Sequence, residues 1–290
     1  MNNRKPPSTT ELSSFKIKIF NNFFERNYGR WRSNKIGDGT EFHALSEYRY
    51  GDSYKKINWL ATARTDKLIT NQTLAERSSR YHIIINATQT MNFGSIRRKS
   101  DIVTELLKTI LDLVASTQDS IKITVIGENV INYPLKNGKA ATLFYKNIIN
   151  KISYEKIEAN EAFYKNYKNK ESTVVIFISD FLDSEAFKNI EKFIINNNVL
   201  PIHIYDPNEY LLPQVGIFKL KQYGSNNTYI IDTKDKNFIS INKALVIEYK
   251  NKLNKLLQLS RYGISLSTTD EHAGKQFISK INKKSAVYAN

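Results

Sequence analysis

The sequence predicts an α/β fold in which a doubly wound, mainly parallel sheet is covered by helices on both faces. The first observation is a series of short, continuous apolar runs, such as Tyr81–Ile85 and Thr173–Ile178, that are typical of strands buried in parallel sheets. The second is that, from Tyr81 onward, these runs alternate with longer segments whose apolar residues recur at a helical period. Repeated strand–helix alternation favours parallel strands joined by crossover helices.

Composition indicates a globular chain and excludes several kinds of site. At 290 residues, 41% of them hydrophobic, the chain is long enough for one large domain or two small ones. It contains no cysteine, which excludes disulfides, thiolate-bound metals and a cysteine nucleophile. Its first ten residues are polar, and no apolar run approaches the roughly 20 residues of a membrane helix. We therefore expect a cytoplasmic protein without a transmembrane segment.

The chain divides into three predicted segments. Residues 1–10 are expected to form a disordered tail, residues 11–80 an N-terminal elaboration packed on the main domain, and residues 81–290 the α/β domain. The elaboration begins with a helix, predicted from the spacing of apolar residues between Leu12 and Phe24. Its other positions carry basic residues, so peripheral contact with a membrane surface is an alternative to packing on the domain.

Apolar runs and helical periods place the remaining elements. Strands are predicted over 67–74, 121–126, 130–134, 173–180, 199–207 and 263–266, with an edge strand over 229–233. Helices are predicted over 96–117, 138–152, 160–169, 183–196, 238–259 and 271–284.

The stretch from residue 37 to residue 64 is the densest run of informative residues. Gly37 and Gly39 predict a tight turn or a close backbone approach, because glycine adopts backbone angles that other residues avoid. A strand is expected to follow, and Gly51-Asp52 predicts a second turn. Asp52 or the serine after it is expected to cap a short helix that holds Trp59 on its apolar face.

The charged residues of this stretch have two interpretations. Arg64 is expected to pair with Glu41, Glu47 or Asp52, which would form a half-buried cluster that fixes how the segment docks. The alternative is a partner-binding surface, since guanidinium groups and aromatic rings favour interfaces. The candidate contact residues are Glu47, Arg49, Asp52, Trp59 and Arg64.

The same stretch resembles the hallmark of domain-of-unknown-function family 58. The family's pattern is G-x-G-x-E-F-x-x-L-R-E-Y-x-x-G-D, followed by I-D-W and A-R-T. Two positions depart from it, because Ser46 stands for the usual Arg and Asn58 for the usual Asp. A further landmark matches at Asp206-Pro207, Glu209, Leu212 and Pro213. The hallmark matches at Gly37, Gly39, Glu41, Phe42, Leu45, Glu47, Tyr48, Gly51, Asp52, Ile57, Trp59, Ala63, Arg64 and Thr65.

The resemblance implies a fold and a partner. Members of the family have a von Willebrand A-like domain and usually occur with MoxR-type AAA+ ATPases. Association with such an ATPase, and a chaperone-like role in the maturation or remodelling of other proteins, are therefore implied, while the client protein is unknown.

The resemblance also implies a degenerate metal site. Von Willebrand A domains carry an Asp-x-Ser-x-Ser loop whose two hydroxyls bind a divalent ion. Here the loop reads Asn86-x-Thr88-x-Thr90, and Asp180, which ends a buried strand, is expected to face the same ion. Threonine keeps the hydroxyls, but Asn86 removes a negative charge. We expect no cofactor in the isolated protein and at most weak Mg²⁺ binding. The alternative is that Thr88 and Thr90 only cap the following helix and close the loop by hydrogen bonds.

Three functions follow from these observations. The preferred one is a non-enzymatic adaptor. The second is a metal-dependent hydrolase or nuclease that uses Asp180, Asp183 and Asp206. The third is binding to nucleic acid or a membrane surface, favoured by the formal net charge of +15. Specific nucleic-acid binding is not expected, because no known nucleic-acid motif accompanies that charge. His203 lies within an apolar alternation and is predicted to be a core histidine rather than a catalytic one.

Overall fold

The computed structural model describes two compact units of the chain. One unit is 23–78, and the other combines 1–22 with 79–290. The packing of the N-terminal elaboration on the main domain stays a prediction, as does the disordered tail. Residues 10–12 are helical, and the rest of the predicted N-terminal helix lies outside the described residues. The described residues are 6–8, 10–12, 36–74, 80–115, 119–154, 161–169, 173–182, 187–211, 215–221, 228–260, 262–269 and 271–287.

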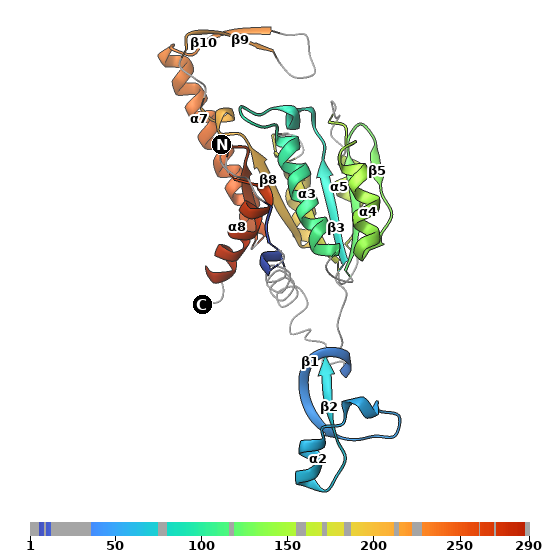
Figure 1. The fold of residues 1–290 in the computed structure, drawn as a ribbon. Helices are drawn as coiled ribbons and strands as arrows, with labels where there is room; N and C mark the ends of the chain where they lie inside the picture. Colours follow the sequence, from blue (N-terminus) through green and yellow to red (C-terminus); the bar gives the residue numbers. More distant parts are fainter. Residues whose placement is uncertain are drawn as a thin grey trace. The chain divides into compact units, whose positions relative to one another are not determined.

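The larger unit is built on a seven-stranded sheet with strand order β11-β8-β7-β3-β4-β5, in which β6 also pairs with β4 (Figure 1). Strands β11, β8, β7, β3 and β4 are parallel, and β5 and β6 run antiparallel to β4. The prediction of a doubly wound, mainly parallel sheet is confirmed. The strands are β3 (Arg80–Asn86), β4 (Ser120–Ile126), β5 (Val130–Asn132), β6 (Lys136–Asn137), β7 (Thr173–Ser179), β8 (Val199–Tyr205) and β11 (Ile264–Ser267).

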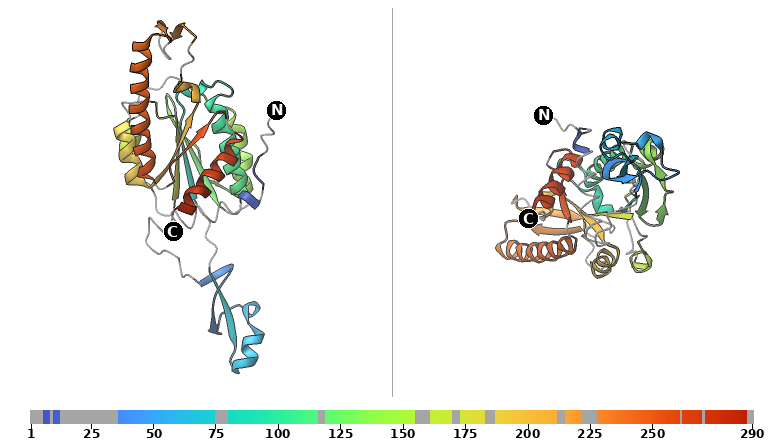
Figure 2. Two further views of the ribbon diagram at one scale, coloured as in Figure 1. Left: turned by 90° about the vertical axis from the view of Figure 1, so that its left-hand side faces the viewer. Right: turned by 90° about the horizontal axis from the view of Figure 1, so that it is seen from below.

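Helices cover both faces of this sheet. Figure 2 shows α3, α4 and α8 on one face and α5, α6 and α7 on the other. Their buried residues follow the apolar rows that predicted them, as with Ile102, Leu106 and Ile110 in α3. No helix among the described residues is long and apolar enough to span a membrane. The helices are α3 (Lys99–Ala115), α4 (Gly138–Ile149), α5 (Glu161–Asn166), α6 (Phe187–Asn197), α7 (Lys236–Leu259) and α8 (Ala273–Val287).

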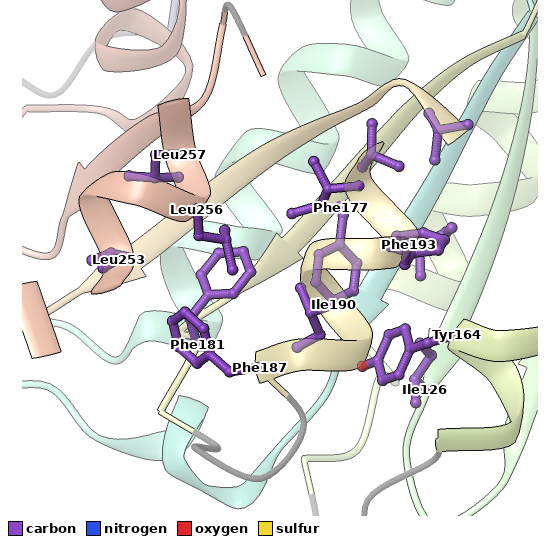
Figure 3. Packing of buried hydrophobic residues seen from close by; sticks show 14 residues of the cluster. Ile126, Tyr164, Phe177, Phe181, Phe187, Ile190, Phe193, Leu253, Leu256 and Leu257 are labelled. Carbon is purple, nitrogen blue, oxygen red and sulfur yellow. The ribbon is translucent and has the colours of Figure 1, made fainter. Parts of the chain in front are cut away.

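An aromatic cluster fills the space between β7 and helices α5 and α6 (Figure 3). The ring centroid of Phe177 lies 5.9 Å from that of Tyr164 and 5.5 Å from that of Phe193, and both pairs meet edge to face. This is the geometry that aromatic quadrupoles prefer. Helix α7 closes the cluster only near its C-terminal end, where Leu253, Leu256 and Leu257 are its buried side chains.

The prediction of an edge strand over 229–233 is wrong in its sheet. Strand β10 (Thr228–Asp232) exists, but it pairs with β9 (Ile217–Lys221) in a separate antiparallel ribbon. Thr233 Oγ1 closes this ribbon, because it accepts from the backbone N–H groups of Val215 and Gly216 at 3.1 and 3.0 Å. Alternating apolar residues predict a strand but not the strand that pairs with it. Here the hydrogen bonds of Thr233 help to hold β9 and β10 together.

The described part of the smaller unit is an antiparallel pair of strands, β1 (Ile36–Glu47) and β2 (Ile69–Leu74). Between them lie the 3₁₀ turn η1 (Tyr54–Lys56) and helix α2 (Trp59–Thr65). The tight turn predicted at Gly37 and Gly39 is wrong, because both glycines lie within β1. Gly37 and Phe42 both oppose Thr73, so the glycines accompany an interruption of the strand register.

Helix α8 approaches α3 most closely at Gly274. A Cβ atom at this position would lie 2.1 Å from Thr109 Oγ1, which is far inside van der Waals contact. We expect Gly274→Ala to lower the free energy of unfolding by about 1–3 kcal/mol, because the two helices must move apart. Urea denaturation measures this change. Gly127→Ala is the control, since its Cβ would meet nothing closer than 3.8 Å, and equal losses in both variants would contradict the close approach.

Candidate functional site

The candidate site lies where the connections of the sheet diverge. Helix α3 follows β3 on one face, whereas α6 follows β7 on the other, and β3 and β7 are neighbours. The loops after these two strands therefore separate at the carboxyl edge of the sheet, which is where doubly wound folds bind ligands. The first loop carries Asn86, Thr88 and Thr90, and the second carries Asp180.

The structure brings most of the predicted site residues together. Thr90 Oγ1 donates a hydrogen bond to Asp180 Oδ2 at 2.5 Å, and the hydroxyl oxygens of Thr88 and Thr90 are 2.8 Å apart. Because the single hydroxyl hydrogen of Thr90 is directed at Asp180, Thr88 must donate to Thr90. The Asn86 side chain instead donates to Ser179 Oγ at 3.2 Å. Asp180 is thus the acceptor at the end of a chain of hydroxyl groups.

Side-chain capping is not found for Thr88. This residue is the N-cap of the 3₁₀ turn η2 (Gln89–Asn92), but its side chain makes no capping hydrogen bond. The Thr88 hydroxyl instead bonds to that of Thr90, which closes the loop, and the Thr90 hydroxyl bonds across the edge of the sheet to Asp180.

A buried lysine that sequence reasoning missed completes the cluster. Lys99, the first residue of α3, is 0% exposed, and its Nζ lies 2.8 Å from Asp180 Oδ2 and 2.5 Å from Glu209 Oε1. A buried ammonium requires such partners. Lys99 follows two arginines, and lysines are rarely fully buried, so its burial was not predicted. The available signal was its position three residues before Ile102 and seven before Leu106, on the buried face of the predicted helix.

Glu209 belongs to the short turn η3 (Pro207–Glu209). Its Oε2 accepts from the backbone N–H of Asp206 at 3.0 Å as part of a capping box, which leaves Oε1 for Lys99. Burial raises the pKa of the Glu209 carboxyl, although the Lys99 ammonium opposes this shift. The family landmark over residues 206–213 therefore supplies a carboxylate to the cluster.

Asp206 is a brace between three loops. Its carboxylate accepts hydrogen bonds from Ser95 N at 2.7 Å, Thr268 Oγ1 at 2.5 Å and Asn208 N at 2.9 Å. Burial favours the neutral acid, but these hydrogen bonds outweigh it and lower the pKa of Asp206. Of the carboxylates required by the hydrolase hypothesis, Asp206 and Asp180 are thus held by protein groups. Asp183 lies outside the described residues.

The cluster does not fit a bound divalent ion. Lys99 Nζ already contacts both Asp180 and Glu209, so an ion held by these carboxylates would lie against an ammonium group. Among the described residues, no group of three or more His, Asp or Glu side chains is placed to hold a metal.

Comparison with known proteins identifies the family. The model of the family described as "Protein of unknown function DUF58" matches residues 45–246. The chain belongs to this family. The match contains the second half of the hallmark and the whole landmark over residues 206–213, which confirms the resemblance. No curated protein matches the chain significantly.

Solved structures resemble the DUF58 chain in fold alone. BatB, a conserved hypothetical protein from Bacteroides thetaiotaomicron, is 12% identical with a TM-score of 0.41, over 72% of this chain and 100% of that one. An aerotolerance-related membrane protein from Bacteroides fragilis is 12% identical with a TM-score of 0.40, over 71% and 100%. A von Willebrand factor type A protein from Catenulispora acidiphila is 11% identical with a TM-score of 0.42, over 74% and 44%.

The predicted partner contacts of the DUF58 chain lie in its smaller unit, and all five are exposed. Glu47 pairs with Lys67 at 2.5 Å, and Asp52 Oδ2 accepts from the backbone N–H of Arg49 at 2.9 Å. Arg64 forms no ion pair with Glu47 or Asp52 within the described part of the chain, and the side chain of Glu41, its third expected partner, lies outside that part. Trp59 is exposed rather than buried. The half-buried charge cluster is therefore wrong for these residues.

The departure at Asn58 has a structural role. Neither Asp52 nor Ser53 caps α2, since Asn58 Oδ1 accepts from the backbone N–H of Ala61 at 3.0 Å. The aspartate that the family usually carries here could cap the helix in the same way. The Asn58 amide additionally donates to Asn71 Oδ1 at 3.0 Å, which joins the start of α2 to β2.

Two histidines of the DUF58 chain are buried within strands of the main sheet, His82 in β3 and His203 in β8. His203 lies 3.1 Å from Ser265 Oγ and 3.4 Å from the Tyr210 hydroxyl, as expected for a core histidine. His82 Nδ1 lies 2.7 Å from the Tyr167 hydroxyl, and its Nε2 lies 2.8 Å from Thr124 Oγ1. Burial lowers the pKa of both histidines to about 3. Both imidazoles are therefore neutral.

The hydrogen bonds of His82 determine its tautomer. Thr124 donates its only hydroxyl hydrogen to Asn132 Oδ1 at 2.8 Å, so it can only accept from the ring. His82 Nε2 therefore carries the proton, and Nδ1 accepts from the Tyr167 hydroxyl.

Proposed function

We propose that this DUF58 protein is a non-enzymatic adaptor that binds a MoxR-type AAA+ ATPase in the maturation or remodelling of other proteins. The identity of the ATPase comes from the family resemblance. The observation that carries a binding role is the exposed apolar surface of the smaller unit. Among residues 42–73 only Thr70 is buried, whereas Trp59 and Leu60 are each 68% exposed.

The exposed apolar side chains stand beside exposed cations. Arg64 follows Leu60 by four residues in α2, so the two share one side of the helix. Tryptophan and arginine are the residue types that contribute most to the centres of interfaces. Large exposed apolar groups are costly in water and favour burial against a partner. The remaining large apolar side chains exposed on this unit are Phe42, Leu45, Tyr50, Tyr54 and Leu68.

The state of the sheet edge supports the non-enzymatic part of the proposal. A hydrolytic metal centre needs carboxylates that are free to coordinate an ion. Asp180 is instead bound to Lys99 and Thr90, and Asp206 to three loops. Because Asp180 and Asp206 are both buried, we assign recognition to the smaller unit rather than to this edge.

Co-purification tests the proposal. Tagged protein is recovered from its native cell with and without nucleotide, and bound proteins are identified by mass spectrometry. We expect an AAA+ ATPase in the wild-type sample. Trp59→Ala and Arg64→Ala are each expected to weaken its binding about tenfold or more, which is the size of a typical interface hot spot.

Matched variants separate recognition from general surface properties. Lys55→Ala removes another exposed cation of the same unit, and Tyr229→Ala removes an exposed aromatic side chain of the larger unit. Both are expected to keep the ATPase. The proposal is overturned if ATPase binding ignores Trp59 and Arg64, or if nucleic acid or lipid is recovered and no ATPase appears under any condition.

A further inference from the structure

We infer that the Lys99 ammonium is a built-in replacement for the divalent cation at the carboxyl edge of the sheet. The site is then filled by the protein's own side chain and is closed to Mg²⁺ and Mn²⁺. Lys99, rather than a bound ion, joins the loop after β7 to the turn η3. The inference is independent of the proposed ATPase partner.

The position of the ammonium supports this assignment. Lys99 Nζ and Thr90 Oγ1 bind the same oxygen, Asp180 Oδ2, at 2.8 and 2.5 Å. The ammonium therefore binds the carboxylate that the metal-site pattern predicts as a ligand, and it shares one oxygen of that carboxylate with the predicted Thr90 hydroxyl. Glu209 Oε1, at 2.5 Å from Nζ, supplies a second carboxylate from another loop.

Relative to the resembled metal site, the positive and the negative charge of the cluster are reduced by the same amount. The resembled metal site has an aspartate where this chain has Asn86, so one negative charge is absent. Lys99 carries one positive charge where the ion would carry two. Both signs of charge are thus reduced by one, which is the change required for a buried site to keep its balance.

Removing the lysine would expose a conventional set of hard ligands. Asp180 and Glu209 would then face each other without a cation, with the Thr90 hydroxyl beside them. Carboxylate and hydroxyl oxygens are the ligands that Mg²⁺ and Mn²⁺ prefer. A unit charge about 4 Å from a divalent ion, at an effective dielectric constant of about 20, changes the affinity for that ion by well over about a thousandfold. Loss of Lys99 should therefore convert a closed site into a metal site.

The test measures divalent-ion binding by the full chain. The thermal unfolding midpoint and the Mn²⁺ electron paramagnetic resonance signal are recorded in chelator and in millimolar Mg²⁺ or Mn²⁺. Wild type is expected to show the same midpoint in all conditions and no bound Mn²⁺. Lys99→Ala is expected to have a lower midpoint in chelator, to recover with either ion, and to bind Mn²⁺ at least about a hundredfold more tightly than wild type.

Three further variants make the test decisive. Lys108→Ala removes an exposed lysine of the same helix and should behave as wild type. Adding Asp180→Asn to Lys99→Ala should abolish the gained Mn²⁺ binding. Lys99→Ala with Glu209→Gln keeps Asp180 and has fewer unpaired charges, so it serves if Lys99→Ala does not fold, and it should gain Mn²⁺ binding that is weaker than the binding expected of Lys99→Ala. Metal binding by wild type that Asp180→Asn removes would overturn the inference, as would folded Lys99 variants that gain none.

Discussion

Lys99→Met is expected to lower the free energy of unfolding by about 3–5 kcal/mol when measured in chelator. The substitution removes the ammonium but leaves Asp180 and Glu209 facing each other in a site where Asp180 is buried and Glu209 is largely so. An uncompensated buried charge costs far more than an exposed ion pair contributes, because neither the protein nor water solvates it. Urea denaturation near neutral pH measures the loss.

Matched variants separate the loss of charge balance from the loss of packing. Lys108→Met changes an exposed lysine of α3 and is expected to stay within about 0.5 kcal/mol of wild type. Lys99→Met combined with Asp180→Asn and Glu209→Gln removes all three charges and should recover part of the lost stability. A Lys99→Met protein as stable as wild type would mean that the two carboxylates find other partners.

Acidification below pH 6.5 is expected to destabilise the protein through His82 and His203. Each histidine has a folded-state pKa near 3, whereas an unfolded histidine titrates near 6.5. Between these values the unfolded chain binds more protons, so stability is full above pH 6.5 and is lost as the pH falls toward 3. Each histidine contributes a slope of up to about 1.4 kcal/mol per pH unit. Urea denaturation at pH 7, 6 and 5 measures this slope.

Single substitutions assign the slope to each histidine. His82→Gln and His203→Gln should each reduce the slope by up to about 1.4 kcal/mol per pH unit, because glutamine does not titrate. The slope that remains includes His272, whose pKa burial also lowers. The absolute stability of both variants is expected to fall, so the informative quantity is the dependence on pH. His43→Gln changes an exposed histidine and is expected to leave the slope unchanged. A wild-type stability that is flat between pH 7 and 5 would contradict the buried, neutral state of both rings.

The main sheet could be predicted because its signals are local. The continuous apolar runs at 81–85 and 173–178 are buried parallel strands, and the helical periods between runs gave helices on both faces. Pairing over longer distances could not be predicted in the same way. The apolar alternation of β10 predicts a strand, but it does not predict that β9 is its partner. Hydrogen bonds of Thr233, which join the ends of the two strands, leave no trace in the periodicity of the sequence.

Part of the candidate site was predictable, because the resemblance to von Willebrand A domains implies a hydroxyl loop and a strand-end carboxylate at these positions. Thr88, Thr90 and Asp180 meet as expected. Lys99 was missed because lysines are rarely fully buried and this one follows two arginines. The prediction for Trp59 in the smaller unit was wrong for a related reason. Trp59 was assigned to a buried face because tryptophan is usually buried, but its short helix has no buried residue at all.

The N-terminal part of helix α7 extends beyond the buried cluster of the larger unit. The Tyr249 hydroxyl in α7 donates a hydrogen bond to the Asp180 carbonyl at 3.0 Å, and the buried residues of α7 all lie after Tyr249 in the chain. From there to its start at Lys236 the helix extends about 20 Å, at 1.5 Å per residue. The β9–β10 ribbon is joined to that far end (Figure 1). A force applied to the ribbon would therefore be transmitted along α7 to the backbone carbonyl of Asp180, whose side chain binds Lys99. Helix α7 thus couples the ribbon mechanically to the edge of the sheet.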